Sequence, residues 1–344
     1  MEATITIKQN GDFSDELLNP EFEKIINLAA TAFDYTYTME ALYSNCYATN
    51  NNDWKSYTTQ KINANNRSLN TAWSNLYTLN RYLNAMEEYE PTISTYIIPL
   101  RTFLYYHLTT LWGDVPYFTH VFQPGDNISR TSTSEIYSSL QKQLEKSITD
   151  LPLENNGTYF GVSKSVPRVL LAKILMQQKK YSEALALLEE IISSKMYKLN
   201  KDRNEALSSL STEMIYAIDI ETFATPNFAD IIETNKYLPL IQYSEVILLA
   251  AECSNKVGAI SNAVDYLNQI RRKDEVSSAI NASFDVDLKE TWKSRMKGAF
   301  SYFDFLKRNN IATIELSIQK HQELFPIPYN EIAMNPNMTQ NSGY

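Results

Sequence analysis

The sequence predicts an all-α protein, in which a tetratricopeptide-like helical-repeat scaffold carries loop-rich inserts. Apolar residues recur at helical spacing over most of the 344 residues, and one helical-hairpin pattern occurs twice. Glycine is scarce, with 8 residues, which disfavours all-β folds with many turns and glycine-rich phosphate-binding loops. We expect a single domain over residues 1–344.

Long helices are expected throughout the first half of the chain. Their predicted ranges are 20–47, 67–90, 91–111 and 134–150. Asn19 and Pro20 provide a cap and a first-turn residue for the first of them. The second has an apolar stripe that assigns Trp73 to the core. The third stops at Gly113, with Pro116 beyond it, which is typical of a helix C-terminus.

Two helical hairpins are predicted in the second half, near residues 165–195 and 240–273. Small residues allow the two helices of each hairpin to approach closely, and larger residues fill the seam. The hairpin residues are Leu171, Ala172, Leu175, Tyr181, Ala184 and Leu188, then Ala250, Ala251, Gly258, Ile260, Ala263 and Leu267. The second pattern begins later than one repeat of about 34 residues allows. An insert near 195–239, expected to be loop with short strands, therefore interrupts the array.

The C-terminal residues 324–344 combine prolines with apolar side chains. Pro326 and Pro328 remove backbone donors and fix φ, so we expect an extended segment rather than a helix or a central strand. Neighbours such as Phe325 and Ile327 make it too apolar for a solvated tail. The segment is predicted to dock on a core built elsewhere and to act as scaffold.

Composition and charge exclude some classes of partner. The net charge of −9 and the isoelectric point near 5.1 argue against nucleic acid, which needs a clustered basic face. Cys46 and Cys253 are expected to be buried thiols rather than a disulfide. No run of 18 apolar residues occurs. The first residues are polar and predict no signal peptide, which fits either a cytosolic protein or a chain trimmed of its leader.

Catalytic and metal-binding motifs are missing. None of the histidines, His107, His120 and His321, has a partner at metal-ligand spacing, and His107 lies on an aromatic helix face that favours a structural role. The sequence contains no HExxH, GxSxG, GxGxxG or Walker A pattern. Asp285 and Asp287 could hold a cation, although a solvated or capping pair is favoured. We therefore predict no enzyme, no cofactor and no metal site.

Five motifs occur in an order that is found in a known family. They are residues 110–117 (TLWGDVPY), 130–133 (RTST) before 135–137, 242–252 leading to 267–271, 300–308 with its FDFLKR run, and 325–328 (FPIP) with 335–336 and 340–344. In this order, they make residues 21–344 resemble the SusD/RagB family of nutrient-binding outer-membrane lipoproteins of Bacteroidetes. The motifs themselves look structural: we expect Gly113 to end a helix and Asp114 to accept hydrogen bonds from turn amides.

The resemblance implies tetratricopeptide-like units and attachment to the outer membrane, at the cell surface, through a lipidated N-terminal cysteine. It also implies a SusC-like TonB-dependent transporter as partner, glycans as ligands (peptides in the RagB branch) and no enzymatic activity. The chain departs from the family pattern in two ways. It contains no lipobox cysteine, so its only membrane contact would be an anchor that this sequence lacks. It is also short, which reduces the inserts that usually build the ligand site.

Ligand residues are sought on loops that combine flat aromatic faces for sugar C–H surfaces with amides or carboxylates for hydroxyls. Residues 50–57 (NNNDWKSY) fit this description, and the predicted ligand contacts there are Asn52, Asp53, Trp54 and Tyr57. A Trp54 that fastens its loop to the scaffold is an equal alternative.

Two further clusters are candidates. Phe223 and Phe228 lie in the predicted insert, and Tyr159 and Phe160 lie in the loop 155–161. The favoured hypothesis is a surface protein that binds an oligosaccharide for a transporter. The alternative is a repeat surface that binds peptide or protein, and an intracellular adaptor is a third reading.

Overall fold

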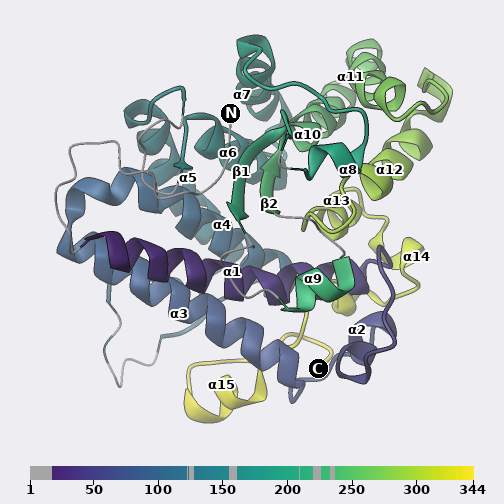
Figure 1. Ribbon diagram of the computed structural model, residues 1–344. Coiled ribbons are helices and arrows are strands. Elements are labelled where there is room, and N and C mark those ends of the chain that lie inside the picture. Colours follow the sequence, from purple (N-terminus) through teal and green to yellow (C-terminus); the bar gives the residue numbers. More distant parts are fainter. Residues whose placement is uncertain are drawn as a thin grey trace.

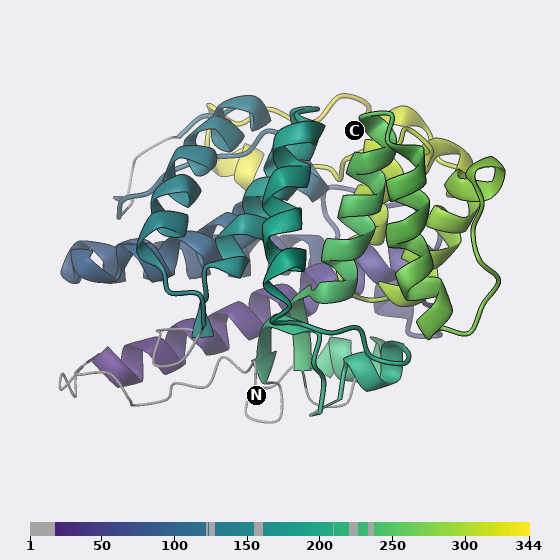
Figure 2. The same cartoon turned by 90° about the horizontal axis from the view of Figure 1, so that it is seen from above.

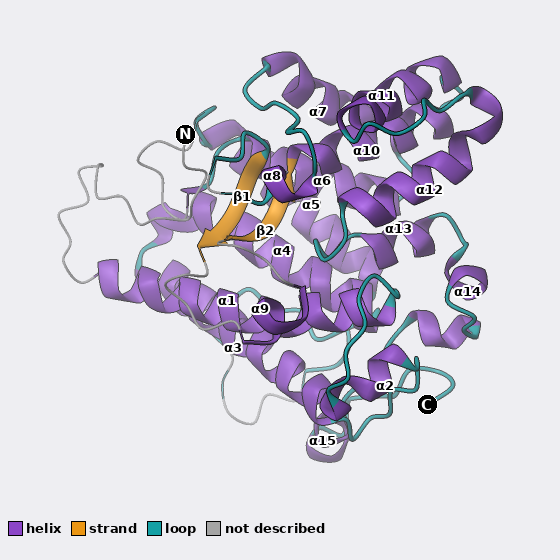
Figure 3. Cartoon of the chain, turned by 45° about the vertical axis from the view of Figure 1, so that its right-hand side comes forward, coloured by secondary structure: helices purple, strands orange, loops and turns teal. Residues whose placement is uncertain are grey.

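The structure, a computed structural model, describes residues 18–121, 123, 128–154, 161–208, 210–219, 226–232 and 237–344. Helices dominate this part of the chain, as Figure 3 shows, and the predicted all-α, tetratricopeptide-like class is confirmed. The elements, in chain order, are α1 (Leu18–Tyr43), η1 (Asn52–Trp54), α2 (Lys55–Thr58), α3 (Arg67–Tyr89), η2 (Pro91–Ile93), α4 (Ser94–Trp112), α5 (Thr133–Asp150), α6 (Ser165–Gln177), α7 (Tyr181–Ser194), α8 (Arg203–Ala206), β1 (Met214–Asp219), α9 (Pro226–Ile232), β2 (Tyr237–Gln242), α10 (Tyr243–Lys256), α11 (Ile260–Lys273), η4 (Asn281–Ser283), α12 (Phe284–Arg295), α13 (Tyr302–Arg308), α14 (Ala312–Glu315), η5 (Lys320–Glu323) and α15 (Tyr329–Met334).

Helix α4 occupies the centre of the molecule. Every residue from Ile97 to Trp112 is buried, because α3, α5 and α6 all pack on it. A helix that is apolar on all sides needs such complete cover. Helix α1 lies alongside α3 (Figure 1). The stripe that places Trp73 in the core is also observed, since Trp73 is buried.

The first helix ends earlier than the sequence suggests. Helix α1 stops at Tyr43, because Asn45 adopts a left-handed backbone conformation with φ of 56°. The Cys46 amide then donates to the Ala41 carbonyl over 3.0 Å, which closes the helix end. Cys46 is therefore outside the helix, whereas Cys253 is inside α10. Both are buried free thiols, as predicted.

Two helical hairpins, α6–α7 and α10–α11, stand next to each other through α7 and α10 (Figure 2). The small residues Ala172, Ala184, Ala250 and Ala263 are fully buried at the helix contacts. Between the hairpins, the chain forms α8, α9 and an antiparallel pair of strands, β1 and β2, in which Ala217 lies opposite Pro239.

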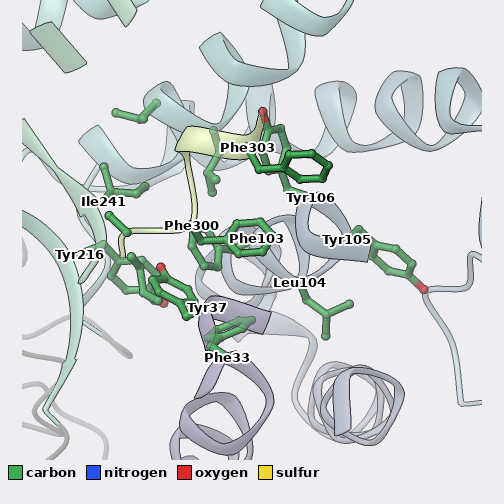
Figure 4. Packing of buried hydrophobic residues seen from close by; sticks show 14 of the residues in the cluster. Phe33, Tyr37, Phe103, Leu104, Tyr105, Tyr106, Tyr216, Ile241, Phe300 and Phe303 are labelled. Atoms are coloured by element: carbon green, nitrogen blue, oxygen red, sulfur yellow. The ribbon is translucent and has the colours of Figure 1, made fainter. Parts of the chain in front are cut away.

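An aromatic core joins the N-terminal helices to the chain after α12. Figure 4 shows Phe33, Tyr37, Phe103 and Phe300 gathered around one point. His107 lies among them, and its ring stacks on Phe300 with centroids 3.5 Å apart. The predicted structural role of this histidine therefore agrees with its position.

A buried polar cluster fastens α13 to the second hairpin. Arg308 donates to both carboxylate oxygens of Glu252, over 3.0 and 2.8 Å, and forms an ion pair with Asp304. Asp304 also accepts hydrogen bonds from Tyr106 over 2.5 Å and from Gln177 over 2.7 Å. Burial raises the pKa of Asp304. The charges of Arg308, Lys173 and Lys307 and the hydrogen bond from Tyr106 together outweigh this effect and hold that pKa below its usual value.

The C-terminal segment is extended only in part. Phe325 and Ile327 are fully buried, and the Phe325 amide donates to the Leu111 carbonyl over 2.6 Å. The prediction of no helix is wrong after Pro328, where α15 begins. The two prolines fix the backbone only up to that residue, so the chain beyond it is free to turn into a helix.

The helix end after α4 confirms the structural reading of its motif. Gly113 has φ of +76°, and a Cβ at this residue would lie 2.9 Å from a Leu324 methyl carbon. The Asp114 carboxylate accepts hydrogen bonds from the Thr133 amide over 2.8 Å and from its hydroxyl over 3.0 Å. Asp114 thus anchors the start of α5 rather than its own turn.

Candidate ligand-binding site

The amides of the asparagine-rich loop mainly cap helices. The Asn51 side chain accepts from the Asp53 amide over 2.9 Å and opens η1. The Asn66 side chain accepts from the Leu69 amide over 2.9 Å and opens α3. Asn52 and Asp53 are exposed and free to meet a ligand.

The two predicted aromatic ligand residues of this loop are buried. Trp54 is 2% exposed and Tyr57 is 0% exposed. Trp54 packs on Tyr35 and Tyr57, with ring centroids 6.0 and 5.3 Å apart, and the Tyr57 ring lies 5.9 Å from that of Phe325. A buried ring offers no face to a sugar, so the geometry corrects the stacking role and supports the alternative, in which Trp54 fastens its loop to the scaffold.

We expect Trp54→Ala to lower the free energy of unfolding by about 3–5 kcal/mol, because it leaves a large cavity in the core. Urea unfolding followed by circular dichroism measures this loss. Asp53→Ala is the matched control: its exposed side chain should cost less than about 0.5 kcal/mol. Equal unfolding midpoints for the two variants would contradict the fastening role.

The second predicted cluster is only partly described. Phe223, Tyr159 and Phe160 lie outside the described residues, and Phe228 belongs to α9, without a described side chain. Helix α9 packs on α1, where the Asn227 amide donates to Asp34 over 2.7 Å. The loop with Trp54 and the insert therefore meet the same helix, at the adjacent residues Asp34 and Tyr35.

A solvent-open hollow of about 370 Å³ lies between α3, the chain that follows α4, and the C-terminal segment. Its lining residues are Trp73, Ser74, Tyr77, Thr78, Arg81, Pro116, Phe118, Ile128, Glu331, Asn335 and Met338. The volume suits one or two sugar rings or a short peptide. We call this site the aromatic hollow.

Aromatic rings form one wall of the aromatic hollow. Tyr77 and Phe118 are stacked, with centroids 5.8 Å apart and planes 20° apart, and both are half-buried. The Tyr77 hydroxyl donates to the Pro116 carbonyl over 2.8 Å, which fixes the ring. Trp73 packs behind Tyr77 at 5.0 Å. Ordered, half-exposed rings are the surfaces on which the C–H faces of sugars pack.

Polar groups converge from the other walls. Glu331 is half-buried, and burial raises the pKa of its carboxyl, although a hydrogen bond from Trp73 opposes the rise. The Asn335 amide donates to the Ile128 carbonyl over 2.9 Å. Arg81 lies exposed at the rim, one helical turn beyond Tyr77. Carboxylate acceptors and guanidinium donors can together bind sugar hydroxyls.

The sequence did not indicate this hollow. Tyr77 fits the apolar stripe of its helix, and the segment with Glu331 is predicted to be scaffold. They come together because the chain at the start of α15 is joined to the loop before α3, where the Tyr329 amide donates to the Ala64 carbonyl over 2.9 Å. The local signal for a surface site was Arg81, a charged residue that continues the apolar stripe of Trp73 and Tyr77.

The described ranges contain no candidate metal centre. No group of three histidine, cysteine or acidic side chains there is placed to hold a metal ion. Asp287 forms an ion pair with Arg271 at 3.1 Å and accepts from Ser283, which gives it a structural role, whereas Asp285 is exposed to solvent. Within the same ranges, no helix combines the length and the apolar character that crossing a bilayer requires.

The fold and the hollow together define a helical-repeat protein with a candidate ligand site on its surface. The model of the SusD family matches residues 23–273, so the chain belongs to this family. The chain is also 24% identical over 178 residues to the SusD-like protein P25 of Formosa agariphila. That match covers 46% of this chain and 33% of the relative, about a third of its length.

Solved structures show the same fold. A SusD superfamily protein from Bacteroides vulgatus superposes with a TM-score of 0.81 at 15% identity, over 94% of this chain and 98% of that one. Surface glycan-binding protein A from Bacteroides thetaiotaomicron, in complex with laminarihexaose, gives 0.74 at 18% identity, over 94% and 99%. At these identities the likeness concerns the fold.

Proposed function

We propose that this protein binds a nutrient oligosaccharide at the cell surface, in the aromatic hollow, and delivers it to a SusC-like TonB-dependent transporter. The observation that carries the proposal is the stacked Tyr77–Phe118 pair, which faces a hollow with Glu331 and Arg81 on its other sides. Family membership and the glycan-bound neighbour support the ligand class. The function is binding without catalysis.

Family membership supports a location at the outer membrane. We propose that a lipid anchor on a leader outside this sequence holds the protein on the outer membrane, with the transporter as its partner. Co-purification of the transporter with the tagged, full-length native gene product tests this part. Recovery of the protein from the cytosol, without a transporter, would overturn it.

A glycan array tests the ligand class, with laminarihexaose, the ligand of the neighbouring structure, as the first probe. We expect Phe118→Ala to fold and to bind its glycan roughly tenfold more weakly, because a stacking face is lost. The backbone of Phe118 should hold its place, since its carbonyl accepts from Asn80 over 3.1 Å and from Tyr105 over 3.2 Å.

Tyr89→Ala is the matched control, because Tyr89 is an aromatic residue of α3, the helix that carries Tyr77, and is 64% exposed outside the aromatic hollow. It should bind like the wild type. Wild-type affinity in Phe118→Ala would remove the hollow from the glycan site. Binding of peptides but of no glycan would replace the ligand class with the alternative predicted from the sequence.

A further inference from the structure

A second hollow, of about 320 Å³, opens where α4, α5, α13 and the C-terminal segment meet. Its charged lining residues are Asp114, Arg130, Asp304 and Lys307. It shares no lining residue with the aromatic hollow. We call it the polar hollow. Most of its lining residues belong to the motifs of the sequence, and the proposed glycan function gives them no role.

The two carboxylates of the polar hollow already have strong partners. Asp304 pairs with Arg308 and accepts from Tyr106 and Gln177. One oxygen of Asp114 accepts two hydrogen bonds from Thr133. The negative charge of Asp304 is therefore neutralised from the side facing the core, by a cation that does not line the hollow.

The two cations of the polar hollow have no direct ion-pair partner in the ranges that the structure describes: neither Lys307 nor Arg130 forms an ion pair with a carboxylate there. Burial lowers the pKa of both, and the nearby carboxylates, Asp304 and Glu323 for Lys307 and Asp114 for Arg130, offset this effect only in part. Lys307 donates to the Thr110 carbonyl, and Arg130 donates to backbone carbonyls and to the Asn341 side chain. An ammonium has three donors and a guanidinium has five, so N–H groups of both remain for a ligand.

We propose that the polar hollow binds a small oxyanion, held between Lys307 and Arg130. Phosphate, sulfate and the carboxylate of a small acid share this chemistry. Each would accept the remaining N–H donors and neutralise positive charge that burial makes costly. Burial lowers the pKa of the Lys307 ammonium to about 8, which reflects this cost. The proposal does not depend on the glycan function.

Titration calorimetry with sodium sulfate, at constant ionic strength maintained by sodium chloride, tests the site. We expect saturable binding to the wild type and binding at least roughly tenfold weaker in Lys307→Met. Lys320→Met is the matched control, because this lysine lies on the neighbouring η5 with a side chain that is 72% exposed. It should bind like the wild type. Parallel titrations with phosphate and acetate identify the preferred oxyanion.

A second measurement separates binding through the Lys307 charge from a structural effect. The charge of sulfate is constant between about pH 7 and pH 9, whereas Lys307 loses its proton in this range. Sulfate affinity should therefore fall with rising pH in the wild type and stay constant in Lys307→Arg, since arginine remains charged.

Three outcomes would overturn the proposal. They are chloride binding as strong as sulfate binding, wild-type affinity in Lys307→Met, and the same pH profile in Lys307→Arg as in the wild type. If Lys307→Met does not fold, Lys307→Gln keeps a donor for the Thr110 carbonyl but removes the charge. It should show the same loss of sulfate binding.

Discussion

Arg308→Met should lower the free energy of unfolding by about 3–5 kcal/mol. The substitution leaves two carboxylates, Glu252 and Asp304, buried without their cation: their side chains are 1% and 3% exposed. It also removes the two hydrogen bonds by which Arg308 joins α13 to Glu252 of the second helical hairpin. Urea unfolding at neutral pH measures the effect.

A surface ion pair provides the matched control. Lys289 and Glu315 are 2.6 Å apart, and their side chains are about 30% exposed. Lys289→Met should cost less than about 1 kcal/mol, because water solvates the remaining carboxylate. Equal losses for the two variants would contradict the argument that burial decides the cost. Adding Glu252→Gln to Arg308→Met should restore part of the stability, since one of the two uncompensated charges is removed.

The helical scaffold could be predicted because its signals are local. Helix spacing, small residues at close contacts and the glycine after α4 each act within a few residues of the chain. The misplaced boundaries have local causes that sequence patterns express weakly. A left-handed Asn45 ends α1 early, and the backbone after Pro328 is free to form α15. Asparagine also occurs inside helices, and the residues after Pro328 also occur in extended segments, so their types alone do not fix these boundaries.

The ligand site could not be predicted in the same way. Residues 50–57 have the composition of a sugar site, but Asn51 caps η1 and Trp54 packs in the core beside Tyr35. Composition cannot distinguish an amide that caps a helix from one that binds a ligand. The aromatic hollow instead joins Tyr77 to Glu331 through tertiary packing, which no local pattern records.

Two buried groups should make the stability depend on pH in opposite directions. His107 has its pKa lowered well below 6.5 by burial, so its contribution is present above about pH 6.5 and is lost as the pH falls. Glu40 has its pKa raised from 4.5 to about 7, also mainly by burial. Its contribution is present at low pH and is lost as the pH rises through about 7.

Hydrogen bonding explains why neither group accepts its charge easily. Nδ1 of His107 lies 2.8 Å from the Thr36 hydroxyl, whereas its Nε2 has no hydrogen-bond partner in the structure. Protonation would place an unpaired N–H in the aromatic core. One Glu40 oxygen accepts from the Phe303 amide over 2.6 Å, and the other has no partner. The backbone amides of Phe303 and Tyr302 lower the pKa of Glu40, but they replace only part of the hydration that the buried carboxylate loses.

Between about pH 4.5 and pH 6.5 the two effects oppose each other, with slopes of about 1.4 kcal/mol per pH unit for each proton. Glu40→Gln should therefore reveal a loss of stability as the pH falls, because only the histidine effect remains. His107→Gln should reveal the opposite, a gain of stability as the pH falls. Urea midpoints measured across this range test both, with the exposed His120→Gln as control. Parallel pH profiles for all variants would show that these two groups do not titrate differently in the folded and unfolded chains.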